Sequence, residues 1–333
     1  MSQQKQTNAT LDSDQDSNQI ELNNGQLRVV ILPLGASIQS IHLSGYEHSL
    51  VLGSASLDRY LDQAKYFGAV VGRVANRTAQ GRALIDNQQY TLPLSPPEKH
   101  HLHGGPLGTS YKNWSVVEHN DAQVHLQSVL ADGEMGYPGK MVADVFYRLH
   151  GTALELEILA TTDQLTICNF AGHSYFNLDG QGSVLDHKLA IQAEHYLPVT
   201  EELIPTGEVQ AVQDTPFDFR TLRRIARDDY PGLDTNFCLA QDKQPVRDVA
   251  TLIGPLTGIQ MSLKTNETGL QIYDGRHIQL AQEHNINHGP LSAYSGLAME
   301  AQAWPDAINH THFPSILLSP KDRYQQITRY CFS

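Results

Sequence analysis

Hydrophobic residues occur at alternating positions in many short segments of this 333-residue chain. The clearest examples are residues 123–130 (QVHLQSVL) and 141–149 (MVADVFYRL). Alternation of this kind is typical of a β-strand with one buried and one exposed face. Turn-forming pairs such as Asp132-Gly133 separate the segments. The chain is therefore predicted to adopt an all-β fold.

The other predicted strands continue this pattern along the rest of the chain. They cover residues 27–32, 36–43, 153–162, 164–170, 188–199, 259–266, 269–275, 296–304, 315–320 and 324–332. Only residues 57–63 and 222–228 are predicted to be helical, and both segments are brief. Many short strands joined by turns favour a large β-sandwich. No linker and no repeat of fixed period divides the sequence, so residues 21–333 are expected to form a single domain.

Residues 1–20 differ in composition from the rest of the chain. They are rich in Gln, Asn, Ser and Asp and contain almost nothing that could be buried, so a flexible polar arm is expected here. The arm lacks the apolar core and the basic residues of a secretory signal. No later segment approaches the roughly 18 consecutive apolar residues of a membrane span. We therefore expect a soluble, cytoplasmic protein.

The overall charge limits the classes of partner. The 23 basic and 36 acidic residues give a formal charge of −13, which repels nucleic acids and anionic membranes but not a neutral small molecule.

The three cysteines are odd in number and form no CxxC pair. We therefore expect reduced thiols, with neither a disulfide framework nor a zinc ribbon. The expected assembly is a monomer or a homodimer.

Two segments in the first third of the chain place polar residues beside glycines. The apolar run YFGAVVGRVANR ends in Asn76 and Arg77, a pattern that, taken alone, favours an arginine paired on the surface. In HHLHGG, His101 and His103 share one face of an extended backbone, a spacing that also occurs in metal sites. No cysteine and no obvious carboxylate lies nearby to complete a ligand set, so a structural or ligand-facing histidine is favoured over metal binding.

Two later segments carry polar residues on otherwise apolar strands. In GHSYFN, alternation places His173, Tyr175 and Asn177 on one face, and a core face would not select these side chains. In AMEAQAW, Glu300 has small and apolar neighbours and shares its face with Gln302. Burial there would raise the pKa of the Glu300 carboxyl and make it a usable general base. An edge-strand glutamate that faces water is the alternative interpretation.

Taken together, these segments resemble the galactose mutarotase (aldose 1-epimerase) family. The shared stretches, in the order of the family, are YFGAVVGRVANR, LHGG, GHSYFNLDG, YLPVTEELIPTGE, PFDFR, GLDTNF, GLQIYDG and the tail from MEAQAWPDAINH to FPSILLSPKDRY. Eight blocks in order, over about Leu27 to Ser333, make the resemblance specific. It implies a β-supersandwich with a sugar-binding cleft on one sheet face.

The resemblance also implies roles for individual residues. The catalytic acid of the family falls on His173 and the catalytic base on Glu300. The sugar-binding residues of the family fall on Asn76, Arg77, His103, Asp234 and Gln271. No metal ion, nucleotide or flavin is implied.

The sequence departs from the family pattern next to two of these residues. Thr235 follows Asp234 where a histidine is common. Met299 and Ala301 flank Glu300 and differ from the common ETQ run. Our hypothesis is that the smaller Thr235 leaves the cleft roomier beside Asp234 and shifts the ranking among aldose substrates.

The expected activity is the interconversion of the α and β anomers of free hexoses such as galactose and glucose. One group must remove the proton of the anomeric hydroxyl O1 and another must protonate the ring oxygen O5, and a carboxylate of raised pKa and a histidine suit these roles. A hexose-6-phosphate 1-epimerase on the same fold would need convergent basic residues, whereas the densest cluster, Arg220–Arg227, is mixed with aspartates. A non-catalytic sugar-binding protein is disfavoured because His173 and Glu300 are both present.

Overall fold

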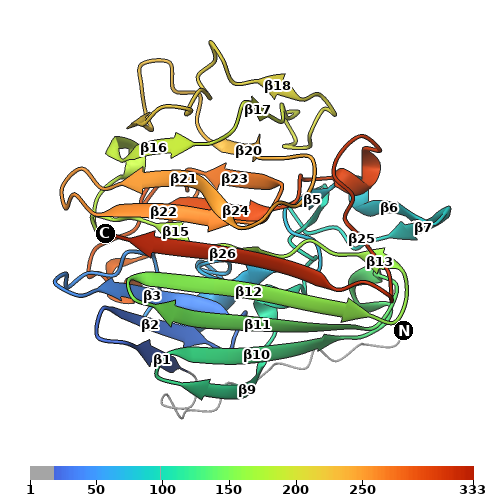
Figure 1. Cartoon of the computed structure of the whole chain (residues 1–333), viewed down its shortest axis with the longest axis horizontal. Helices are drawn as coiled ribbons and strands as arrows, with labels where there is room; N and C mark the ends of the chain where they lie inside the picture. The colour runs from blue at the N-terminus through green and yellow to red at the C-terminus, as the bar shows by residue number, and fades with distance from the viewer. Residues whose placement is uncertain (1–18, 98) are drawn as a thin grey trace.

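The regular secondary structure of the chain consists almost entirely of antiparallel β-strands, as the sequence predicts (Figure 1). The computed structural model describes residues 19–97 and 99–333. The predicted arm at residues 1–20 therefore lies outside the described residues except for its last two, and Ile20 already begins strand β1 with a buried side chain. Within the described part of the chain, no helix is long and apolar enough to cross a membrane.

Three sheets form the body of the fold. The nine-stranded sheet contains, in spatial order, β19 (Arg223–Arg224), β16 (Lys188–Ile191), β21 (Arg247–Ile253), β22 (Gln260–Thr265), β26 (Tyr324–Phe332), β12 (Ala153–Thr162), β11 (Met141–His150), β10 (Gln123–Leu130) and β9 (Ser115–Asn120). The six-stranded sheet contains β15 (Tyr175–Phe176), β24 (Leu297–Gln302), β23 (Gly269–Tyr273), β20 (Asp234–Cys238), β17 (His195–Tyr196) and β18 (Gln210–Ala211). The three-stranded sheet contains β1 (Ile20–Asn23), β2 (Leu27–Leu32) and β3 (Ser37–Leu43).

Short strand pairs and single helical turns connect these sheets. The pairs are β4 (Val70–Val71) with β14 (Ala171–Gly172), β5 (Arg77–Thr78) with β8 (His101–Leu102), β6 (Arg82–Ile85) with β7 (Gln88–Thr91), and β13 (Thr166–Ile167) with β25 (Leu317–Leu318). The helical turns are of the 3-10 type: η2 (Leu57–Leu61), η3 (Ala79–Gly81), η4 (Thr109–Tyr111), η5 (Glu134–Gly136), η6 (Val184–Asp186), η7 (Gln282–His284) and η8 (Ala307–Asn309).

One hydrophobic core joins the three sheets. Every second side chain of β11 from Met141 to Leu149 is buried, as alternation predicts. The same buried cluster includes Val29 from the three-stranded sheet, Leu270 from the six-stranded sheet and Tyr330 from the nine-stranded sheet. Figure 1 shows β26 crossing the middle of the molecule between β12 and β22. This continuous burial of apolar surface is the main stabilising contribution to the fold.

The six-stranded sheet has one apolar and one polar face. Leu270 and Ile272 of β23 point into the core. Gln271 lies between them in the strand and therefore points to the opposite face. The register pairs Gln271 with Asn236 on β20 and with Glu300 on β24. A row of polar side chains thus lies across three neighbouring strands whose other face closes the core.

The two predicted helices differ from the prediction. Residues Leu57–Leu61 form only the single turn η2. Residues 222–228 contain no helix, because Arg223 and Arg224 pair as β19 with β16 at the edge of the nine-stranded sheet. This tertiary pairing outweighs the weak local preference of the segment for a helix.

Gly72 and Gly104 allow two loops that carry polar residues to approach each other closely. Gly104 has a φ of 84°, and a Cβ at this position would lie 1.6 Å from the carbonyl oxygen of Gly72. Gly72 lies four positions before Asn76 in the sequence, and Gly104 directly follows His103. The glycine contact therefore fixes the distance between these two segments.

We predict that Gly104→Ala destabilises the fold much more than Gly258→Ala. Gly258 also has a positive φ, of 74°, but a Cβ there would meet no atom within 4 Å. Its substitution should cost only the strain of a left-handed backbone, roughly 1–2 kcal/mol, whereas Gly104→Ala adds a backbone clash. Thermal unfolding of the two variants measures the difference. An equal loss of Tm in both would contradict this role of the Gly72–Gly104 contact.

Candidate active site

A cleft of about 360 Å³ opens on the polar face of the six-stranded sheet. Its volume falls within the range of small-molecule sites. Six of the seven predicted site residues line it: Asn76, Arg77, His103, His173, Asp234 and Glu300. These residues are far apart in the sequence, so the fold alone brings them together.

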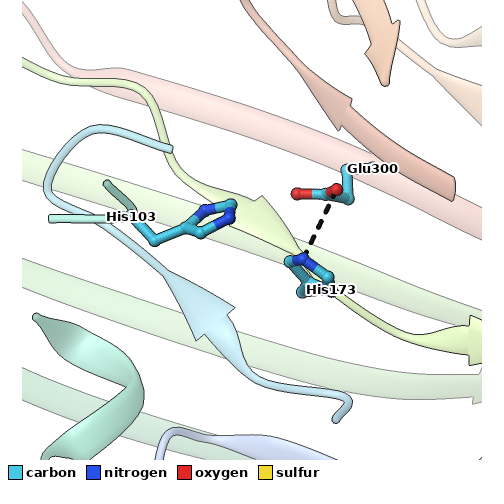
Figure 2. A group of neighbouring side chains, drawn as sticks. All are labelled: His103, His173 and Glu300. Atoms are coloured by element: carbon cyan, nitrogen blue, oxygen red, sulfur yellow. Dashed lines mark ion pairs between the residues drawn. The ribbon is translucent and has the colours of Figure 1, made fainter. Parts of the chain in front are cut away.

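His173 and Glu300 form the centre of the cleft. The Nε2 atom of His173 lies 3.5 Å from Oε1 of Glu300 (Figure 2). Glu300 is only 2% exposed and lies on β24 between β15 and β23, which excludes the alternative of an edge-strand glutamate that faces water. Its second oxygen, Oε2, is buried and has no hydrogen-bond partner among the described residues. A buried acceptor without a partner is costly, and a donor on a ligand would satisfy it.

Burial shifts the pKa values of the two groups in opposite directions. Burial raises the pKa of Glu300 well above its ordinary value, the charge of Asp234 raises it further, and Arg77 partly offsets these effects. Burial also lowers the pKa of His173 to about 4. In each case the dry surroundings disfavour the charged form. The Glu300 carboxyl therefore binds a proton more readily than an ordinary carboxyl, and His173 releases one more readily than an ordinary imidazole, so the two groups can exchange a proton.

The tautomer of His103 follows from its contact with Asn76. The backbone N–H of Asn76 donates to Nδ1 of His103 at 3.1 Å, and the backbone N–H of His103 donates to the Asn76 carbonyl at 2.9 Å. Burial holds the pKa of His103 well below its ordinary value, so the ring is neutral. Because Nδ1 accepts a hydrogen bond, Nε2 carries the proton and is a donor. Both residues have left-handed backbones, with φ values of 60° and 49°, a strain typical of functional sites.

This tautomer also bears on metal binding. His103, His173 and Glu300 each place one potential ligand atom within 4.8 Å of the others (Figure 2). Neither nitrogen of His103 offers a free lone pair while Nδ1 accepts and Nε2 donates, so these residues do not form a ready metal site. His101 is not part of the group, because its ring bonds a backbone carbonyl and the Tyr137 hydroxyl. The structure therefore separates the two histidines of the HxH pattern.

Arg77, Asp234 and Gln271 form a polar wall of the cleft. Nη1 of Arg77 lies 3.9 Å from Oδ2 of Asp234, and Nε2 of Gln271 donates to Oδ1 of Asp234 at 2.6 Å. Arg77 is buried, so the interpretation of this residue as a surface charge is wrong. Gln271 does not line the main cleft but lies beside Asp234 in the sheet. It therefore holds the carboxylate in place.

Two aromatic residues that were not among the predicted site residues also line the cleft. The ring of Tyr66 stacks on His173 with centroids 5.6 Å apart, and Tyr175 lies 5.0 Å from the same imidazole. Tyr66 begins the YFGAVVGRVANR segment, and Tyr175 shares the predicted face with His173, so both signals were present. Asn177, predicted on that face, instead donates to the carbonyl oxygens of a neighbouring turn and of Ser295. Asn177 therefore shapes a loop and is absent from the cleft lining.

The departures from the family pattern lie on the core side of the sheet. Thr235 pairs with Ile272, whose side chain belongs to the hydrophobic core, and does not line the cleft. Met299 is fully buried in the same core. The hypothesis that Thr235 widens the cleft beside Asp234 is therefore wrong, because alternation turns its side chain away from the sugar face.

The comparisons with known proteins agree with this geometry. A family model described as aldose 1-epimerase matches residues 18–331. Galactose mutarotase of Bos taurus is 38% identical over 322 residues, which cover 94% of this chain and 93% of the relative. Aldose 1-epimerase of Escherichia coli (strain K12) is 35% identical over 326 residues, 93% of each chain.

Solved structures share the fold. A GalM/aldose epimerase homologue from C. elegans superposes with a TM-score of 0.87 at 31% identity, over 95% of this chain and 98% of that chain. A galactose 1-epimerase from Lactobacillus acidophilus superposes with a TM-score of 0.82 at 28% identity, over 95% of this chain and 94% of that chain. The predicted supersandwich is confirmed, and the relatives identify this β-sandwich protein as an isomerase. The chain belongs to the aldose 1-epimerase family.

We predict that metal removal leaves the activity unchanged. The His103 tautomer leaves no complete ligand set around the His173–Glu300 pair. The measurement is the epimerisation rate before and after dialysis against EDTA, with added zinc or manganese as a second arm. A loss of rate on dialysis that either metal restores would contradict the assignment.

Proposed function

We propose that this enzyme interconverts the α and β anomers of free hexoses such as galactose and glucose, with Glu300 and His173 as the proton-transfer groups. The observation that carries the proposal is the buried contact of 3.5 Å between a carboxyl of raised pKa and an imidazole of lowered pKa. Anomer exchange requires one proton to be removed and one to be supplied, and this pair does both without help from solvent.

The reaction begins with ring opening. Glu300 accepts the proton of the O1 hydroxyl while His173 donates a proton to O5. The C1–O5 bond breaks as the C1=O1 double bond forms. Rotation about the C1–C2 bond presents the other face of the aldehyde, and O5 then attacks C1. During ring closure His173 takes back the O5 proton and Glu300 returns its proton to O1, so the enzyme ends as it began.

The proton must reside on His173, with Glu300 ionised, at the start of this sequence. Moving it from Glu300 to His173 leaves the total charge of the pair unchanged. Arg77 lowers the pKa of Glu300, and a sugar hydroxyl would donate to Oε2 of its carboxylate, which has no partner among the described residues, so both favour the ionised form. The neutral His103 presents Nε2–H as a further donor. Asp234, held by Gln271, is an acceptor for a sugar hydroxyl, and Asn76 completes the polar wall.

The basic cluster that the phosphate alternative requires is elsewhere. Arg220 pairs with Asp218 and Glu194, and Arg224 pairs with Asp186. None of these arginines lines the cleft. The cluster therefore offers no support for a hexose-6-phosphate 1-epimerase.

We also propose a cytoplasmic location. The three cysteines, Cys168, Cys238 and Cys331, are free thiols. Thiols persist in reducing compartments, where disulfides are rare.

Substitution of either proton-transfer group is expected to remove nearly all turnover. Glu300→Gln and His173→Asn preserve size, and loss of a positioned acid or base typically costs about 10²–10⁴-fold in rate. The assay is polarimetry of freshly dissolved α-D-galactose and α-D-glucose. His125→Asn is the matched control, because His125 pairs with Asp144 on the nine-stranded sheet and should leave the rate unchanged. A folded Glu300 or His173 variant with more than a tenth of the normal rate would refute the assigned role.

The pH dependence of kcat/KM is expected to show a broad plateau around neutral pH. Below the lowered His173 pKa of about 4, His173 also becomes protonated and the pair loses its base. On the alkaline side the pair loses its last proton, and the raised Glu300 pKa delays this loss. The rate should therefore decline on the acid side near pH 4. A decline centred at the ordinary histidine value of about 6.5 would show that burial does not control this pair.

A further inference from the structure

A small cavity adjoins the cleft beside Asp234. Its volume is about 10 Å³, and Asn76, Leu203 and Asp234 line both spaces. The rest of its lining is partly polar and partly apolar: Asn236, Gln271, Leu197, Val199, Pro205 and Pro305. A volume of roughly 10–15 Å³ is enough for one water molecule where polar groups surround it.

Asn236 has unused hydrogen-bonding capacity at this cavity. Its side chain is buried, with 2% exposed, and neither Nδ2 nor Oδ1 has a hydrogen-bond partner among the described residues. A carboxamide can both donate and accept hydrogen bonds, and leaving all of them unmade in a buried place is costly. A polar partner inside the cavity would remove this cost.

The strand register places Asn236 next to the polar wall of the cleft. Alternation along β20 puts Asn236 on the same face of the sheet as Asp234. Its cross-strand partner on β23 is Gln271, whose Nε2 donates to Oδ1 of Asp234 at 2.6 Å. Gly269 of the same strand leaves room for the amide, because a Cβ there would lie 2.6 Å from Oδ1 of Asn236. Asp234, Asn236 and Gln271 thus form one polar side of the cavity.

The Asp234 carboxylate can accept a further hydrogen bond. Its Oδ1 accepts from Gln271, whereas its Oδ2 lies 3.9 Å from Nη1 of Arg77, which is beyond hydrogen-bond distance. Burial raises the pKa of Asp234, and Arg77 and the Gln271 hydrogen bond partly offset this effect. A further donor would therefore help to keep the carboxylate ionised. A water that accepts from Asn236 can be this donor.

We propose that one water molecule occupies this cavity and joins Asn236 to Asp234, and that Asn236 is a positioning residue for the carboxylate that binds the sugar. The water accepts from Nδ2 of Asn236 and donates to Asp234, while Gln271 donates to Asp234 directly. These two donors hold Asp234 in one orientation as an ionised acceptor for a sugar hydroxyl. The inference rests on the proposed function, in which Asp234 accepts a hydrogen bond from the sugar.

A crystal structure of the wild-type enzyme, at a resolution that shows ordered water, tests the site directly. The expected result is a single water within hydrogen-bond distance of both Nδ2 of Asn236 and the Asp234 carboxylate, with and without bound galactose. A cavity without water, or a water that bonds Asn236 but not Asp234, would overturn the inference. This measurement needs neither a variant nor turnover.

Asn236→Leu tests the positioning role by steady-state kinetics. Leucine keeps the branched shape of asparagine but makes no hydrogen bond. The change should raise KM for galactose about tenfold, as expected for the loss of one hydrogen bond to a charged group. It should leave kcat within about a factor of two, because Asp234 holds the sugar before and during the reaction. Asn236→Ser keeps a hydroxyl for the water and should recover most of the affinity.

The matched control is Thr235→Val. Thr235 neighbours Asn236 on β20, but its side chain does not line the cleft or the small cavity. This isosteric change on the opposite face of the same strand should alter neither KM nor kcat.

The outcomes separate the two claims. Turnover of galactose by the wild type with an unchanged KM in Asn236→Leu, or with a rise in KM that Thr235→Val reproduces or Asn236→Ser does not reduce, would overturn this inference and leave the proposed function standing. Absence of galactose and glucose turnover in the wild type would overturn the proposed function, and this inference with it.

Discussion

The proposed function depends on one contact, between His173 and Glu300. Two ionisable groups lie 3.5 Å apart and almost fully out of water. In water each would titrate at its ordinary pKa, and at neutral pH the carboxyl would be ionised and the imidazole mostly neutral, with no proton left to donate. Dry surroundings raise the pKa of Glu300 and lower that of His173, so both shifts favour a proton shared by the pair. That proton makes both directions of the reaction available to the same two residues.

Each central strand of the six-stranded sheet contributes one face to the hydrophobic core and the other face to the cleft. This arrangement keeps the pair out of water and in place. Leu270 and Ile272 close the hydrophobic core on one face of β23 and its neighbours, while Gln271 and Glu300 occupy the other face. Burial of polar groups is costly unless they have partners. Contacts such as Gln271 to Asp234 reduce this cost, and the large shared core of the three sheets compensates for the rest.

Strand alternation was sufficient to predict the all-β fold, and β2, β10 and β12 have the predicted bounds. It could not predict β9, because every residue of that edge strand is exposed and no alternation results. The resemblance to the family identified six residues that line the cleft. No single segment of the sequence shows that these six side chains lie close together in space. Lys65 and Arg276, which also line the cleft, were missed because isolated cations in a sequence are typical of a solvated surface. Only the tertiary structure places both at one cleft.

The protonation state of Glu300 at neutral pH, in the enzyme without sugar, tests this account most directly. Carboxyl carbons labelled with 13C, assigned by comparison with Glu300→Gln, report it by NMR through their chemical shift. The account predicts that Glu300 is protonated at neutral pH, unlike the exposed glutamates, and that the His173 ring is neutral. An ionised Glu300 beside a neutral His173 at that pH would contradict it, because the pair would then hold no proton to transfer.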